Sequence, residues 1–252
     1  MTGPTSSREF AAFGAVAPYY DELMRTVPYR MWVGYYLLLL SVQEHHPRRI
    51  LDACCGTGTV AELLAREGFE VSGFDISAPM IERAREKAKR KKLDIEYWVS
   101  DAVDVQLNRE FDSAYSFFDS LNNITDPSRL QSAITHIGEH LPTGGSMIFD
   151  LNTAYSFEAR MFDQQNLSRK SRLRYKWVGE WDADRQIITV HMRFWRGDEE
   201  FEEIHHQRAY DESEVRAMLQ TAGFRDIRTY HSYSLDPPRR TTDRIHYTAI
   251  KR

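Results

Sequence analysis

The sequence has 252 residues, of which 28% are charged and 42% are hydrophobic, and its formal net charge is −4 at pH 7. This length allows one large domain or two small ones, and it is sufficient to bury a substantial core. The negative balance argues against a general nucleic-acid surface, because binding along a phosphate backbone requires a basic footprint.

Residues 1–46 are predicted to form an N-terminal helical cap. Residues 17–27 indicate a short helix, and residues 29–45 indicate a longer one that the following proline stops. The most apolar run, residues 31–42, is too short to span a bilayer and is followed by polar residues. We therefore expect a buried helix here and no membrane partner.

Strands and helices alternate over residues 47–164. This alternation favours crossover connections, hence a mostly parallel sheet in an α/β domain with helices on both faces. The predicted strands are residues 49–54, 70–75, 95–101, 111–118 and 144–152, and the predicted helices are residues 58–68, 78–92 and 126–141.

The pattern changes over residues 165–210, which are rich in aromatic and β-branched residues. Turn-forming residues at 182–186 and 196–200 divide this segment into three strands. We expect these strands to form an antiparallel β lid inserted into the parallel domain. Residues 211–252 then predict one helix and two strands that complete the core.

A glycine-rich turn follows the first predicted strand of the core. Gly56, Gly58 and Ala61 satisfy the pattern G-x-G-x-x-G/A, and Asp75 ends the next strand. This arrangement is typical of a nucleotide site, although glycines can also serve a tight turn alone. Asp52 lies just before the turn, where a carboxylate suits a ligand with an ammonium group better than it suits phosphates.

The segment "LDACCGTG", residues 51–58, resembles the first motif of the class I S-adenosylmethionine-dependent methyltransferases, LD-x-G-x-G-T-G. Cys54 stands where that family usually has its first glycine. Residues 117–123, "FFDSLNN", resemble a branch that contains small-molecule N-methyltransferases and uncharacterised bacterial relatives. The resemblance implies a Rossmann-like seven-stranded sheet with the last strand antiparallel.

The same resemblance implies S-adenosylmethionine as the cofactor and S-adenosylhomocysteine as the product. Asp75 would accept hydrogen bonds from the ribose hydroxyls, Met80 would pack on the adenine, and Asp101 would lie near the adenine amine unless it has only a surface role. N-terminal aromatic residues would close the cleft or, alternatively, belong to the core. The predicted cofactor-binding residues are Tyr20, Tyr29, Trp32, Asp52, Cys54, Gly56, Thr57, Gly58, Asp75, Ile76, Met80, Asp101, Ala102, Phe117 and Phe118.

The predicted catalytic residues are Asp119, Glu203 and His205. Methyl transfer from a sulfonium is an in-line displacement, and an amine acceptor must arrive neutral, so a nearby base would help. Strand alternation puts Glu203, His205 and Gln207 on one face, which we expect to cover the cleft. Asp119 and Asn122 follow the fourth strand, where the methyl group should point; helix capping is the alternative role for Asp119.

We therefore expect a methyltransferase that acts on a small molecule, with an amine as the acceptor. The alternatives are an NAD-linked oxidoreductase, because of the glycine pattern, and a cofactor-binding module without catalysis. The only two cysteines, Cys54 and Cys55, are adjacent, and no signal peptide opens the sequence, so a reducing, cytoplasmic location is expected. No residue pattern suggests a metal, and the oligomeric state stays open.

Overall fold

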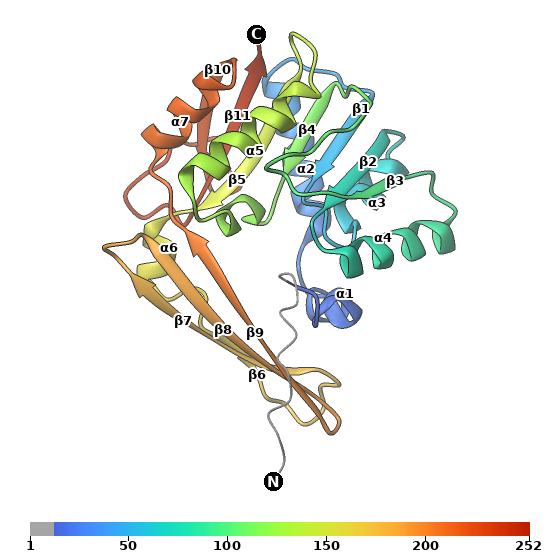
Figure 1. The fold of residues 1–252 in the computed structure, drawn as a ribbon, viewed down its shortest axis with the longest axis vertical. Helices are drawn as coiled ribbons and strands as arrows, with labels where there is room; N and C mark the ends of the chain where they lie inside the picture. The colour runs from blue at the N-terminus through green and yellow to red at the C-terminus, as the bar shows by residue number, and fades with distance from the viewer. Residues whose placement is uncertain (1–12) are drawn as a thin grey trace.

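A computed structural model describes residues 13–252 (Figure 1), so the first twelve residues of the predicted N-terminal cap lie outside the described part of the chain. The protein contains one large sheet and one small sheet. The strands of the large sheet are β1 (Arg49–Ala53), β2 (Glu70–Asp75), β3 (Glu96–Val99), β4 (Ser113–Ser116), β5 (Ser146–Asn152), β10 (Phe224–His231) and β11 (Arg244–Lys251).

The large sheet has the strand order β10-β11-β5-β4-β1-β2-β3. Strands β1 to β5 pair in parallel, whereas β11 lies between β5 and β10 and is antiparallel to both. This confirms the predicted seven-stranded sheet with an antiparallel last strand. The doubly wound sheets of dinucleotide-binding domains have six parallel strands and no such insertion, so the topology separates this protein from the NAD-linked alternative.

Helices cover both faces of the large sheet, and strand alternation decides which residues each face buries. Ile50 of β1 points to a cluster that includes residues of three helices, α2 (Tyr29–Val42), α3 (Thr59–Arg66) and α4 (Ala78–Lys91). The next residue, Leu51, points to the opposite cluster, with residues of α5 (Pro127–Glu139) and α7 (Glu212–Thr221). None of the described helices combines the length and apolar character that crossing a bilayer requires.

The small sheet is the lid, and it extends beyond the carboxyl ends of the parallel strands (Figure 1). Its long strands are the three that the sequence predicts: β7 (Arg174–Asp182), β8 (Ile187–Arg196) and β9 (Glu199–Arg208). A fourth strand, β6 (Gln164–Asn166), pairs with β7 and was not predicted, because three polar residues carry no strand signal. The short helix α6 (Ala154–Glu158) was also not predicted.

The described residues before α2, residues 13–28, form an N-terminal segment that lies between the core and the lid. The predicted helix at 17–27 is shorter than expected, since it consists of a 3-10 turn, η1 (Ala17–Tyr19), and one helical turn, α1 (Tyr20–Leu23). Val16 and Ala17 share a buried cluster with Met80 of α4 and with the inner side chains of β8. The lid is therefore packed against the N-terminal segment as well as joined to the core.

Candidate active site

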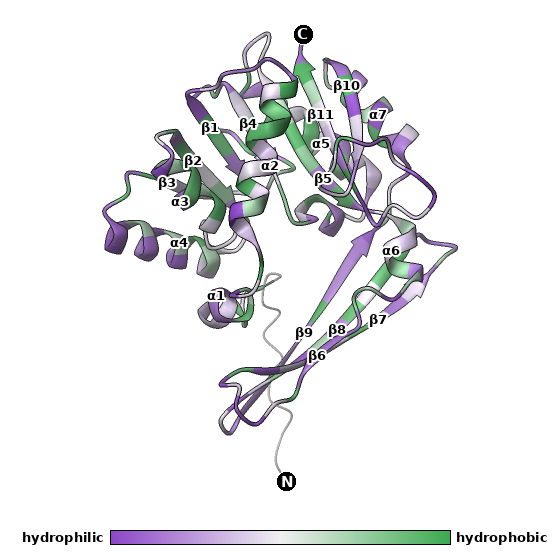
Figure 2. Ribbon diagram, turned by 180° about the vertical axis from the view of Figure 1, so that it is seen from behind, coloured by the Kyte–Doolittle hydropathy of each residue, from purple (hydrophilic) through white to green (hydrophobic). Residues whose placement is uncertain are grey.

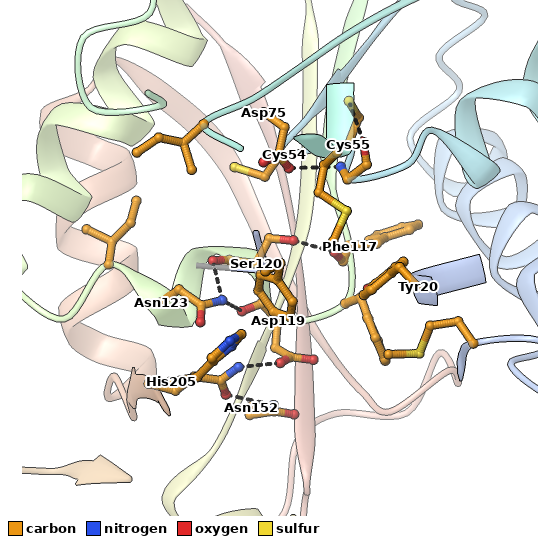
Figure 3. Close-up of a pocket in the computed structure, with 18 of the residues that line it drawn as sticks. Tyr20, Cys54, Cys55, Asp75, Phe117, Asp119, Ser120, Asn123, Asn152 and His205 are labelled. Atoms are coloured by element: carbon orange, nitrogen blue, oxygen red, sulfur yellow. Dashed lines mark hydrogen bonds between the residues drawn. The ribbon is translucent and has the colours of Figure 1, made fainter. Parts of the chain in front are cut away.

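A cavity of about 570 Å³ lies where the carboxyl ends of β1, β2 and β4 meet the lid. This volume is within the usual range for small-molecule sites. Figure 3 shows its two ends: Asp75, Cys54 and Cys55 lie at one, and His205 and Asn152 lie at the other. We call these the cofactor end and the acceptor end.

Most of the residues that the sequence predicts for the site line this cavity. Of the predicted cofactor-binding residues, only Gly58 is not part of the wall, and of the predicted catalytic residues, Asp119 and His205 are part of it whereas Glu203 is not. The wall also contains residues that the sequence motifs did not indicate, among them Arg129, Trp177 and Arg244. Arg129 lies in a predicted helix, and Trp177 and Arg244 lie in predicted strands, but the sequence indicated none of the three as a site residue.

The glycine turn at the cofactor end requires left-handed backbone at three positions. Cys54, Gly56 and Gly58 have φ values of 62°, 53° and 73°. A side chain at Gly58 would also meet the Tyr97 hydroxyl at 2.3 Å, so only glycine fits there. Cys54 adopts the conformation that glycine takes more easily, and burial raises the pKa of its thiol well above the ordinary value. Cys54 is therefore a small wall residue and not an activated nucleophile.

Asp75 is fixed by the backbone of the turn that it faces. Its Oδ2 atom accepts a hydrogen bond from the Gly56 amide at 2.8 Å, and its Oδ1 atom accepts one from the Ser77 amide at 2.9 Å. Each carboxylate oxygen keeps a further lone pair. The carboxylate can therefore still accept two hydroxyl donors from one side.

Asp52 is a buried carboxylate, with 4% of its surface exposed, at the wall of the cofactor end. Burial raises the pKa of Asp52 to about 7; the Tyr115 hydroxyl opposes this rise and Asp75 adds to it. The group is thus balanced between its neutral and ionised forms near neutral pH. A ligand cation beside it would favour the ionised form.

Asp101 is part of the cavity wall, where the resemblance expects it. Its Oδ1 atom accepts a hydrogen bond from the Val103 amide at 3.0 Å, and its Oδ2 atom pairs with Arg129 at 3.0 Å. Met80 is buried nearby on the wall, as is Ala102. Met80 and Ala102 thus form an apolar part of the wall, and the Asp101 carboxylate lies at its polar edge.

The aromatic residues of the N-terminal segment both line the cavity and pack together. The ring of Trp32 lies 5.1 Å from that of Tyr29 and 4.9 Å from that of Phe118, measured between centroids. Tyr20 reaches the cavity from α1 and is drawn in Figure 3 opposite the polar residues of the acceptor end. These aromatic residues therefore both border the cleft and pack against one another as core residues do, which are the two roles that the sequence left open.

A polar network connects α1 to the glycine turn. Thr57 donates a hydrogen bond from its hydroxyl to Asp21 Oδ1 at 2.7 Å. The buried ammonium of Lys87 donates to the same oxygen at 2.8 Å and to the Thr59 hydroxyl at 2.9 Å. Asp21 and Lys87 are 66 residues apart, so no local sequence pattern could have paired them.

At the acceptor end Asp119 belongs to an ion-pair network. Its side chain does not cap the following 3-10 turn, η2 (Ser120–Asn123), which excludes the capping role. Instead Oδ1 pairs with Arg244 at 2.7 Å, and Oδ2 accepts from Gln207 of the lid at 2.6 Å. Arg244 also pairs with Asp150 at 2.8 Å. Burial raises the pKa of Asp119, and Arg244 opposes that rise.

Asn122 has a structural position behind the wall. Its amide nitrogen donates to the carbonyl oxygens of Asn152 at 3.1 Å and Arg208 at 2.7 Å, and its Oδ1 atom accepts from the Asn152 amide at 2.9 Å. These bonds join β5 to β9. Asn122 is not among the residues that line the cavity.

The predicted alternation of β9 is confirmed, because Glu203, His205 and Gln207 are buried on the inner face. His205 Nε2 lies 2.6 Å from Glu203 Oε2, while Glu203 Oε1 accepts from the Val16 amide at 2.9 Å. An ionised carboxylate can only accept, so Nε2 carries a proton and Nδ1 of the neutral ring keeps a lone pair. Nδ1 has no partner among residues 13–252.

Comparison with known proteins places these features in a family. The family profile described as a methyltransferase domain matches residues 50–145. A protein from Geobacillus sp. (strain WCH70) with a provisional methyltransferase name is 29% identical over 95% of this chain and 99% of its own. The dTDP-3-amino-3,4,6-trideoxy-alpha-D-glucopyranose N,N-dimethyltransferase of Streptomyces venezuelae is 30% identical over 40% of this chain and 41% of its own.

Among solved structures, a S-adenosylmethionine-dependent methyltransferase from Clostridium acetobutylicum ATCC 824 superposes with a TM-score of 0.83 at 24% identity, over 96% of this chain and 99% of that one. This likeness establishes the fold. The domain match over residues 50–145 and the relative that covers the whole length support the predicted class, a S-adenosylmethionine-dependent methyltransferase.

Proposed function

We propose that this methyltransferase transfers the methyl group of S-adenosylmethionine to the nitrogen of a small-molecule amine by in-line displacement. The observation that carries the proposal is the single cavity that runs from the carboxylates of the cofactor end to His205 and Asp119 at the acceptor end. One continuous space favours direct transfer between two ligands held side by side, because proximity lowers the barrier to the displacement.

The chemistry of the cofactor end fits S-adenosylmethionine. Asp52 would hold the ammonium group, because a cation stabilises the ionised form of a carboxylate whose pKa is about 7. Asp75, fixed by two backbone amides, would accept the two ribose hydroxyls. Met80 offers an apolar surface to the adenine, with Asp101 at its edge. Bound there, the cofactor would supply a methyl group on a positively charged sulfur.

The residues of the acceptor end would prepare the amine. His205 Nδ1, which keeps a lone pair, would take the proton that an ammonium group must lose before its nitrogen can attack. Glu203 would stabilise the resulting imidazolium through the hydrogen bond to Nε2. The bond between Gln207 and Asp119 holds β9 against the core. Glu203 and Gln207 are therefore positioning residues, and His205 is the proposed base.

Thermal unfolding in the presence of excess S-adenosylhomocysteine tests the proposal. Ligand at about 100 times its dissociation constant adds roughly 2.7 kcal/mol, which raises the unfolding midpoint of a protein of this size by about 5 to 10 °C. NADH should give no shift. Asp75→Ala should reduce the response, whereas Asp94→Ala, which removes an exposed carboxylate, should not. No shift with S-adenosylhomocysteine would refute the proposal.

A further inference from the structure

The inner face of the lid is apolar on β7 and β8, whereas on β9 it is apolar at Phe201 and polar at Glu203, His205 and Gln207. Strand pairing lines up its side chains in rows, each with one residue from β7, one from β8 and one from β9. In Figure 2, β8 is coloured largely hydrophobic and its neighbour β9 largely hydrophilic. The three rows nearest the core are Trp177, Met192 and Glu203; Gly179, Val190 and His205; and Trp181, Ile188 and Gln207, and the next row is Tyr175, Phe194 and Phe201.

This division continues into the cavity. Trp177, Val190 and Met192 contribute apolar surface to the acceptor end, and His205 and Gln207 contribute the polar side. The facing wall is aromatic: it is formed by side chains of the N-terminal segment and of the segment after β4. These are Tyr20, Tyr29, Trp32, Phe117 and Phe118. A molecule between the two walls would be in contact with apolar rings on both sides and with His205 at one edge.

An aromatic ring of the protein itself already occupies part of this space. Phe13 lines the cavity, and its ring lies edge to face against the imidazole of His205, with 4.1 Å between centroids. Edge-to-face packing of this kind is favourable for aromatic pairs. The contact shows that the His205 imidazole has an aromatic ring of the protein as its neighbour on this side.

Positive charge on the cavity wall is already neutralised. Arg129 and Arg244 are the only lysine or arginine residues among the described residues that line the cavity. Arg129 pairs with Asp101, and Arg244 pairs with both Asp119 and Asp150. A phosphate group in this space would meet the carboxylates of these pairs as well as their guanidinium groups, which disfavours an anionic ligand.

We infer that the methyl acceptor is an amine on an apolar, ring-bearing skeleton without phosphate, with its ring against Trp177 and Met192 and its nitrogen towards His205. The inference rests on the proposed function and narrows its substrate class. It also sets this protein apart from the Streptomyces venezuelae relative, whose name specifies a nucleotide-linked amino sugar.

Calorimetric titration of the protein saturated with S-adenosylhomocysteine tests the inference. The probes are phenethylamine and tyramine as ring-bearing amines, and a dTDP-linked 3-amino sugar as the charged alternative. We expect each arylalkylamine to bind at least about tenfold more tightly than the nucleotide sugar. Stronger binding of the nucleotide sugar, or no binding of any arylalkylamine, would overturn the inference. Saturation by S-adenosylhomocysteine is measured first, so a failure of the proposed function itself is recognised separately.

Two tryptophans of the lid provide a matched pair of variants. Trp177 lines the cavity, whereas Trp195 of β8 lies on the opposite face of the lid, 6.0 Å from the Arg174 guanidinium. Trp177→Ala should weaken arylalkylamine binding by on the order of tenfold, because a buried ring contact is lost, and should leave the affinity for S-adenosylhomocysteine unchanged. Trp195→Ala should change neither. Equal effects of both variants on amine binding would contradict the placement of the ring.

Discussion

The two ends of the cavity are built in different ways. The cofactor end consists largely of backbone: three left-handed residues and two amides arrange the turn around Asp75. The acceptor end consists of side chains from distant segments, and its central ion pair joins residues 125 positions apart. The cofactor end therefore depends on local backbone conformation, whereas the acceptor end depends on how the lid and β11 pack against the core. Substitutions should therefore damage the two ends through separate properties.

The largest effect is expected at the acceptor end, from Arg244→Met. The change leaves Asp119 and Asp150 buried without their cation, and removal of one partner of a buried pair costs about 3–5 kcal/mol. We expect the unfolding midpoint to fall by on the order of 10 °C. Arg225→Met removes an exposed pair with Asp226 and should change the midpoint little. Similar midpoints for the two variants would show that the network does not stabilise the fold.

The second prediction is a variant that loses catalytic rate but keeps its stability and its affinity for the cofactor product. His205→Asn should lower kcat for amine methylation by about 100-fold, since a positioned base typically contributes that much, while S-adenosylhomocysteine binds as before. His206, the neighbouring residue, is exposed on the other face of β9, so His206→Asn is the control. A kcat for the His205 variant equal to that of the control would remove His205 as the base.

The third prediction concerns the cofactor end, where a substitution that strains the backbone of the glycine turn should weaken ligand binding. Gly58→Ala introduces a side chain at a φ of 73° and against the Tyr97 hydroxyl, at a cost of about 1–3 kcal/mol. We expect weaker S-adenosylhomocysteine binding in titration calorimetry. Gly34→Ala, in α2 with open space around the position, should leave binding intact and slightly stabilise the helix. Unchanged affinity in the Gly58 variant would mean that the turn does not need its observed conformation.

The smallest effect is a pH dependence. Because the pKa of Asp52 is about 7, the fraction of ionised Asp52 rises about tenfold between pH 6 and pH 8, and binding of S-adenosylhomocysteine should strengthen to the same extent. In the ligand-free protein this pKa lies above the ordinary 3.8, so between about pH 3.8 and about pH 7 the folded state binds more protons than the unfolded state and loses stability as pH rises. Asp52→Asn should make the affinity independent of pH, and a slope that persists in this variant would assign it to another group.

The difference between the two ends also explains how much the sequence could predict. The glycine turn, Asp52 and Asp75 lie within one short segment, so their spacing indicated a nucleotide site, and the resemblance of the segment to a methyltransferase motif indicated which cofactor it holds. Alternation divided β9 into two faces, and the structure confirms the expectation that the face of Glu203, His205 and Gln207 is the buried one.

The pairing of Arg244 with Asp150 and Asp119 was not predicted, because it depends on the insertion of β11 beside β5. The pairing of Lys87 with Asp21 was not predicted either, because it depends on how α1 packs against α4. The strand β6 was missed because its pairing with β7, and not its composition, makes it a strand.

The position of β11 has a consequence for how the protein is made. On the ribosome, Asp150 emerges 94 residues before Arg244, so these two groups cannot pair while the rest of the sheet is being synthesised. The cofactor end, with its contacts over short sequence distances, can form much earlier. Until β11 inserts between β5 and β10, the nascent chain carries two carboxylates without their counter-ion. Insertion of β11 is therefore the step at which the acceptor end becomes complete, and it is a long-range contact of the kind that slows folding.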